Sequence, residues 1–186
     1  MSGGVTTPQH RADLFVDPAT DPRDGPRLGD ERATLTEFVR GQRLTLELKC
    51  GGLDAEQLAR RSVEPSTMSL LGLIRHMAEV ERGWFRRRFA GQDVPKRYQT
   101  EADPDGDFNG AVADPAVVEE AWAAWRDEMA FADEFIRGHE MGFVGADSAG
   151  EPVSLRELLA HMIEEYARHN GHADLLRERI DGRLGQ

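Results

Sequence analysis

The chain has only one cysteine and no long run of apolar residues. Because Cys50 has no second cysteine to pair with, no intramolecular disulfide can form, and this fits a reducing compartment such as the cytoplasm. No apolar segment approaches the roughly 18 residues that a membrane-spanning helix needs. The first 30 residues lack the charged and then apolar pattern of a signal peptide. We therefore expect a cytoplasmic protein without a membrane partner, in which Cys50 is a packing residue and not a nucleophile.

Basic residues and the common catalytic motifs are also scarce. Lysine and arginine number 23 against 34 acidic residues, so the formal net charge is −11. This argues against nucleic-acid binding, because phosphate backbones require a basic surface. The sequence has no Gly-rich phosphate loop, no Gly-x-Ser-x-Gly, no His-Glu-x-x-His and no Cys-x-x-Cys. The commoner nucleotide-binding, hydrolase, zinc-protease and dithiol classes are thereby excluded.

What the sequence does contain is a set of long amphipathic segments. Residues 1–29 are rich in Gly, Pro, Thr and Asp and predict an extended or partly disordered arm, with one anchored turn at 13–16. Residues 30–186 are predicted to form a single all-α domain, a helical bundle with long crossover loops. Apolar periodicity and capping residues predict helices at 30–49, 54–60, 69–89, 114–137 and 154–180, and a short hairpin near 142–153.

Three of the six histidines lie between positions 161 and 172, and they suggest a metal site. Glu165 and His169 are four residues apart, which places them one turn apart on one helical face. His76 lies at the edge of the apolar stripe of the 69–89 helix. Two imidazoles and a carboxylate from two helices suit a divalent metal with open coordination positions. We predict that His76, Glu165 and His169 bind the metal, and that the neighbouring His161 and His172 hydrogen-bond to these ligands or act as acid and base.

Glu81 falls near the centre of the same apolar stripe, where a carboxylate requires a partner. We expect a structural ion pair with Arg40 or Arg43. Since Glu81 lies about 140° around the helix from His76, it is not assigned to the metal.

Three further features, an aspartate cluster, an arginine run and a long loop, are not assigned to the metal site. The aspartates of residues 103–107 superficially resemble a calcium loop, but a proline, an early glycine and a missing final glutamate break that pattern. The arginine run at 86–88 is expected to be a solvated face that complements the helix dipole. The acidic loop at 91–114 is long enough that we expect it to be functional or anchored.

Residues 69–84 (SLLGLIRHMAEVERGW) and 161–176 (HMIEEYARHNGHADLL), together with 104–108 (PDGDF), resemble the DinB-like superfamily. The resemblance spans roughly residues 20–184 and is closest to its mini-circle protein branch. The chain is also similar to mycothiol-dependent maleylpyruvate isomerases, which have glutamate at the position of Glu165. His172 stands where many relatives have glutamine.

The resemblance implies a four-helix bundle with up-down-down-up order, often a homodimer. Separately, the excess of arginine over lysine, 21 to 2, suggests a GC-rich bacterial genome. The resemblance also implies a divalent metal, commonly zinc or nickel, bound by His76, Glu165 and His169. Related members use a low-molecular-weight thiol, mycothiol or bacillithiol, to attack an electrophilic small molecule.

Three functions stay open from the sequence. The leading hypothesis is a metal-dependent thiol S-transferase or isomerase. The alternative is a non-catalytic stress-related or interaction module that keeps the bundle. A third is a non-haem iron oxygenase, because two histidines and a carboxylate also suit ferrous iron.

Overall fold

Helices make up most of the chain in the computed structural model, which describes residues 16–17 and 20–184. The predicted turn at 13–16 therefore lies almost entirely outside the described residues. In chain order the elements are α1 (Glu31–Cys50), α2 (Ala55–Ala59), α3 (Leu70–Glu81), the π-helix η2 (Arg82–Phe89), α4 (Gly106–Asn109), α5 (Pro115–Gly138), β1 (Val144–Ala146), β2 (Pro152–Ser154) and α6 (Leu155–Asp181). The mostly helical class predicted from the sequence is confirmed, and so is the short hairpin, in which β1 and β2 pair antiparallel.

The long helices begin at the capping residues that the sequence predicts. The side chains of Asp30, Asp114 and Ser154 each accept a backbone N–H from the first turn of α1, α5 and α6. Such caps satisfy donors that have no partner within the helix. At the other end of α6, Gly182 adopts a left-handed conformation with φ of 78°, which glycine allows at no steric cost.

The segment predicted as one helix over 69–89 is not a continuous α-helix. From Arg82 onward its hydrogen bonds widen to the π pattern, and it closes with the Ala90 N–H bonded to the carbonyl oxygen of Phe85 at 2.9 Å. Apolar periodicity did not reveal this change, because residues four or five apart, such as Phe85 and Phe89, share a face in either geometry. Widened turns of this kind often occur at functional sites.

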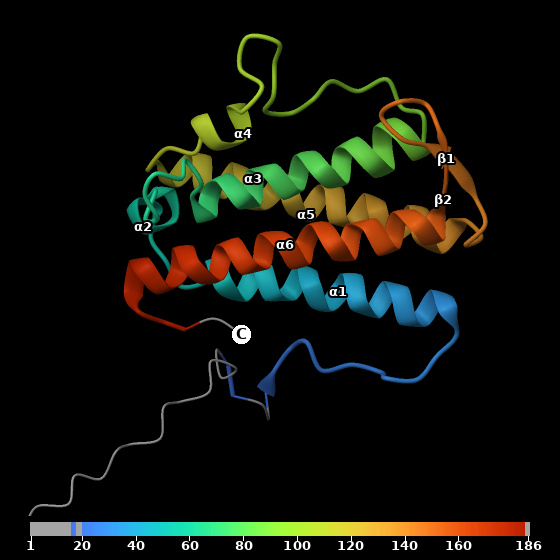
Figure 1. Cartoon of the computed structure of the whole chain (residues 1–186), viewed down its shortest axis with the longest axis horizontal. Coiled ribbons are helices and arrows are strands. Elements are labelled where there is room, and N and C mark those ends of the chain that lie inside the picture. The colour runs from blue at the N-terminus through green and yellow to red at the C-terminus, as the bar shows by residue number, and fades with distance from the viewer. Residues whose placement is uncertain (1–15, 18–19, 185–186) are drawn as a thin grey trace, which may run out of the picture.

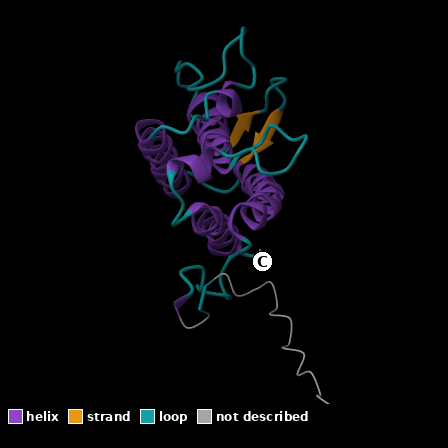
Figure 2. Cartoon of the chain, turned by 90° about the vertical axis from the view of Figure 1, so that its left-hand side faces the viewer, coloured by secondary structure: helices purple, strands orange, loops and turns teal. Residues whose placement is uncertain are grey.

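Four long helical segments lie side by side, with α6 beside α1 and α3 beside α5 (Figure 1). The end view in Figure 2 shows them surrounding a common interior, and Figure 1 shows the two short strands at one end of the helices. Burial of the apolar stripes in this interior is the main stabilising contribution, since each fully buried large side chain is worth roughly 1.5–3 kcal/mol. The largest completely buried apolar residues include Trp125, Phe85, Leu46, Leu73, Met77 and Leu158.

A polar network crosses this apolar interior and ties the four long helices together. Glu81 is fully buried, and both of its oxygens accept hydrogen bonds from the Arg43 guanidinium at 2.8 Å. The Tyr166 hydroxyl donates to Glu81 at 2.7 Å and accepts from the Trp125 indole N–H at 2.8 Å. Burial, with the charge of Glu81, raises the pKa of Tyr166 well above its usual value, so the hydroxyl stays a donor. The predicted structural ion pair is confirmed with Arg43, whereas Arg40 pairs with Glu37 instead.

Cys50 is a packing residue, as predicted. It is 1% exposed, and burial raises the pKa of its thiol to about 12. A neutral, inaccessible thiol is a poor nucleophile. Among the described helices, none combines the length and the apolar character that crossing a bilayer demands.

Candidate metal centre

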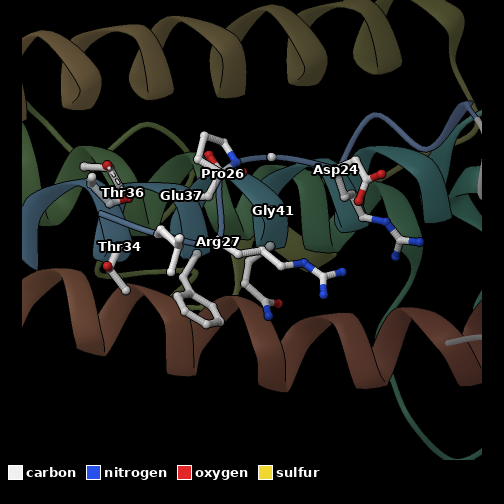
Figure 3. A pocket seen from close by; sticks show the side chains of 13 residues that line it. Asp24, Pro26, Arg27, Thr34, Thr36, Glu37 and Gly41 are labelled. Atoms are coloured by element: carbon white, nitrogen blue, oxygen red, sulfur yellow. Dashed lines mark hydrogen bonds between the residues drawn. The ribbon is translucent and has the colours of Figure 1, made fainter. Parts of the chain in front are cut away.

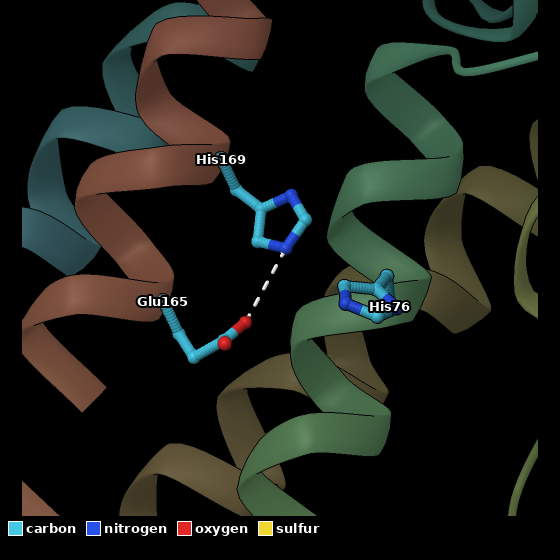
Figure 4. Close-up of side chains that lie close together, drawn as sticks. All are labelled: His76, Glu165 and His169. Carbon is cyan, nitrogen blue, oxygen red and sulfur yellow. Dashed lines mark ion pairs between the residues drawn. The ribbon is translucent and has the colours of Figure 1, made fainter. Parts of the chain in front are cut away.

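The three predicted metal ligands meet between α3 and α6 (Figure 4). His76 comes from α3, and Glu165 and His169 come from successive turns of α6. Each offers one ligand atom, and these atoms all lie within 4.8 Å of one another. The His169 Nε2 is 3.5 Å from a Glu165 oxygen, and the His76 and His169 ring centroids are 4.7 Å apart. Packing of two distant helices thus creates a compact set of two nitrogen donors and one oxygen donor.

A buried aspartate that the sequence analysis did not assign to the site orients His76. The His76 Nδ1 lies 2.8 Å from Asp107 Oδ2, and Asp107 is only 1% exposed. The carboxylate also accepts from the Gln99 side chain at 3.1 Å and from the Phe108 backbone N–H at 3.1 Å. Burial alone would raise the pKa of Asp107, but the hydrogen bond and charge of His76 and these further donors hold it below its ordinary value. The second ring nitrogen of His76 is left for a metal, the usual arrangement of a metal-binding histidine.

The acidic loop that carries Asp107 is anchored to α3, as expected for residues 91–114, and contains the short helix α4. Arg75 donates to the Asp107 carbonyl oxygen at 2.8 Å and lies 3.9 Å over the Tyr98 ring. One turn later, Glu79 accepts the backbone N–H groups of Arg97 and Tyr98 at 2.7 and 2.9 Å. The turn of α3 that presents His76 therefore also fixes the loop.

The other two predicted site histidines lie beside the ligands. The His161 Nε2 is 4.0 Å from a Glu165 oxygen, and its ring packs edge-on against Trp84 with centroids 5.0 Å apart. The His172 Nδ1 is 3.4 Å from the His169 Nδ1. Their chemical roles stay predictions, but both are in position to orient a ligand.

The His169 ring has a lowered pKa, which favours binding of a metal. Burial, reinforced by the nearby His76 and His172, lowers the pKa of His169 from 6.5 to about 4. The ring is therefore neutral near pH 7, with a lone pair available to a cation. A metal would not have to displace a proton from this nitrogen at neutral pH.

A cavity of about 240 Å³ opens beside these side chains. Its walls include His76, Glu165 and His161, together with Trp84, Arg88 and Gln99. A larger cavity of about 700 Å³ lies between residues 23–28 and the outer face of α1 (Figure 3). We place the chemistry in the smaller cavity, because the candidate ligands His76 and Glu165 line it, and none of the three candidate ligands lines the larger one.

Comparison with protein families agrees with this geometry. Residues 34–182 match the family described as Mycothiol-S-transferase. The chain belongs to this family. The match runs from the first turns of α1 to the end of α6, so it contains the three candidate ligands and the aspartate behind His76. No curated protein and no solved structure matches the chain. Membership in the Mycothiol-S-transferase family bears out the expected resemblance to DinB-like mycothiol enzymes.

Asp107→Asn tests the contribution of the buried carboxylate. An amide is a weaker acceptor than a carboxylate, so His76 would be a poorer and less well oriented donor. We expect the affinity for zinc to fall by roughly 10–100-fold. Competition titration of purified protein against a chelating indicator measures this loss. The matched control is Asp105→Asn in the same loop, an exposed residue whose side chain caps no helix. Equal affinities for the two variants would contradict a role for Asp107.

Proposed function

We propose that this protein is a metal-dependent thiol S-transferase that joins mycothiol to a small electrophile. One observation carries the proposal: ligand atoms of His76, Glu165 and His169 lie within 4.8 Å of one another beside a cavity, in a chain of the Mycothiol-S-transferase family. The family indicates the thiol, and the donor set indicates how a thiol would be activated.

The donor set fits a divalent cation such as zinc or nickel. Two imidazole nitrogens and one carboxylate oxygen suit these metals and leave coordination positions open. His76 would bind through Nε2, because its Nδ1 is engaged by Asp107. His169 would bind through Nε2, the nitrogen nearer Glu165, while its Nδ1 lies against His172.

The cation, when bound, would lower the pKa of a thiol and so raise the fraction of the nucleophilic thiolate. The protein side chains do the remaining work. His161 lies on the cavity wall, and we assign to it the uptake of the proton that the thiol loses. His172 holds the ring of His169 through their 3.4 Å contact. Trp84 forms an apolar wall against which an electrophile can be held close to the sulfur.

We further propose the up-down-down-up helix order for the bundle. In Figure 1 the colour advances from right to left along α1 and α6, and from left to right along α3 and α5. This supports two parallel pairs connected by crossovers. Such an order brings the middle of α3 against the middle of α6, where the candidate ligands lie.

The test is transfer of mycothiol to 1-chloro-2,4-dinitrobenzene by zinc-loaded protein. The sulfur forms a bond to the ring carbon, the carbon–chlorine bond breaks, chloride leaves, and the thiol proton passes to His161 and then to water. We expect conjugate formation that requires the metal and is lost in His169→Ala. Full metal occupancy with no transfer from mycothiol to several electrophiles would instead favour the non-catalytic interaction module. Iron in anaerobically prepared protein would favour the oxygenase.

A further inference from the structure

The candidate cavity is lined by three cations as well as by two of the candidate metal ligands. Arg87 and Arg88 of η2 and Lys96 of the following loop all line it, together with His76 and Glu165. The chain as a whole carries a formal charge of −11, so composition alone does not predict a gathering of positive charge at this place.

None of these three cations forms an ion pair in the described part of the chain, although the charge of Asp147 acts on Arg88. Among residues 16–17 and 20–184, no Asp or Glu oxygen lies within 4.0 Å of Arg87, Arg88 or Lys96 in an ion pair. Their neighbour Arg86 differs, because it donates to the buried Glu128 at 2.5 Å. The prediction that residues 86–88 form one solvated face is therefore wrong for Arg86. The run divides into one structural arginine and two arginines that face the cavity.

The carboxylates that line the cavity do not neutralise these three cations. Glu79 already accepts two backbone N–H groups from the 91–114 loop. Glu165 belongs to the candidate metal centre, where a cation would take its charge. With a metal bound the cavity would thus be electropositive. Among the described residues, an anion entering it would meet the guanidinium groups of Arg87 and Arg88, which form no ion pair there, and the ammonium group of Lys96, which donates to the neutral Gln99 side chain at 3.0 Å.

Arg88 is positioned for planar recognition. Its guanidinium carbon lies 4.5 Å from the centroid of the Trp84 ring, a cation–π contact that limits the freedom of the side chain. Burial lowers the pKa of Arg88 and the charge of Arg87 lowers it further, while the charge of Asp147 acts in the opposite direction. A carboxylate would satisfy the guanidinium with two parallel hydrogen bonds and relieve this repulsion.

The spacing of residues along α3 and η2 explains why Arg88 shares a wall with His76. Residues four apart share a face in the α-helix and also in the π-helix that follows it. The strip that begins at His76 on α3 passes Val80 and Trp84 and ends at Arg88, and all four residues line the cavity.

We propose that Arg87, Arg88 and Lys96 bind a carboxylate of the electrophile, so that the substrates of this site are small anionic electrophiles. The inference rests on the proposed function, in which thiol and electrophile meet in this cavity. The metal centre would activate the sulfur, and the three cations would hold the other reactant by the end that does not react.

The first test compares iodoacetate with iodoacetamide, two alkylating agents that differ only in carboxylate against amide. In both reactions the mycothiol sulfur bonds to the CH₂ carbon, the carbon–iodine bond breaks, iodide leaves, and the thiol proton passes to solvent. With zinc-loaded protein we expect the ratio of enzymatic kcat/KM, iodoacetate over iodoacetamide, to exceed the uncatalysed ratio. In Arg88→Gln this ratio should fall by roughly tenfold, the loss expected for a charge-assisted hydrogen bond. Arg179→Gln, an exposed arginine near the end of α6, is the matched control and should keep it.

The second test needs no turnover. Propionate and propionamide are titrated into zinc-loaded protein without thiol, and the indole N–H signal of Trp84 is followed by NMR. We expect a response to propionate that weakens in Arg88→Gln and Lys96→Gln. If the Trp84 signal responds to propionate while mycothiol is alkylated by neither iodo compound, the anion site is supported and the proposed function fails. If transfer proceeds but neither the ratio nor the titration depends on the three cations, the anion site is refuted and the transferase proposal survives.

Discussion

Purified His76→Ala and His169→Ala are each expected to contain almost no metal, whereas the unaltered protein should hold about one divalent ion per chain. Each substitution removes one nitrogen from a three-ligand set, and the remaining two donors do not define a tight site. Elemental analysis after dialysis, with zinc or nickel supplied during expression, measures the content. This is one of the two largest effects that the structure predicts.

The matched control for this experiment is His139→Ala. That ring lies against Phe135, with centroids 3.9 Å apart, and its Nδ1 is 2.8 Å from the Phe135 carbonyl oxygen, outside the metal centre. The His139→Ala protein should therefore keep its full metal content. Circular dichroism would verify that all three variants remain folded. Stoichiometric metal in both His76→Ala and His169→Ala would disprove the ligand assignment.

Replacing Glu81 by alanine should cause the second large effect, on stability. The substitution leaves the buried Arg43 guanidinium without its main counter-charge and the Tyr166 hydroxyl without its acceptor. Breaking a buried pair by removing one partner costs about 3–5 kcal/mol. For a protein of this size, that free energy corresponds to a decrease in Tm of roughly 6–20 °C. Urea unfolding followed by circular dichroism measures the loss of unfolding free energy.

The exposed pair of Glu31 and Arg156 provides the comparison. It has a similar geometry, with Nε and Oε1 2.8 Å apart, but both side chains are about half exposed. Because solvent screens such pairs, Glu31→Ala should cost less than about 1 kcal/mol. A Glu81→Ala protein as stable as Glu31→Ala would show that the buried network contributes little.

The fold was largely predictable because its signals are local. Amphipathic periodicity located the long helices, and the caps Asp30, Asp114 and Ser154 located their starts to within about one residue. The π-helix was not predictable, because the widening at Arg82 leaves the order of apolar and polar residues unchanged. The pairing of Glu81 followed from its place in an apolar stripe, although only the packing of α1 could choose Arg43 over Arg40.

The candidate site was predictable where its residues share a helix. Glu165 and His169 are one turn apart, so their spacing alone places them together. The meeting with His76 required α3 to pack against α6, which the spacing of residues within one helix does not specify. Asp107 was missed because it lies 31 residues beyond His76, in the short helix α4 of the 91–114 loop, where no periodicity links the two side chains. A buried carboxylate in an acidic loop gives no signal of its own, since its neighbours in sequence are equally acidic.

One turn of α3 binds the 91–114 loop through Arg75 and Glu79, and the same turn carries His76, which contacts Asp107 of that loop. The same turn of α3 therefore holds both the loop and one ligand of the candidate metal centre. An engineer who wished to change substrate preference by grafting a loop from a relative would also disturb the aspartate that steers His76. The 91–114 loop is therefore not a separate module. A redesign of specificity has to keep the contacts of Arg75, Asp107 and Glu79 intact while it alters the other residues of the loop.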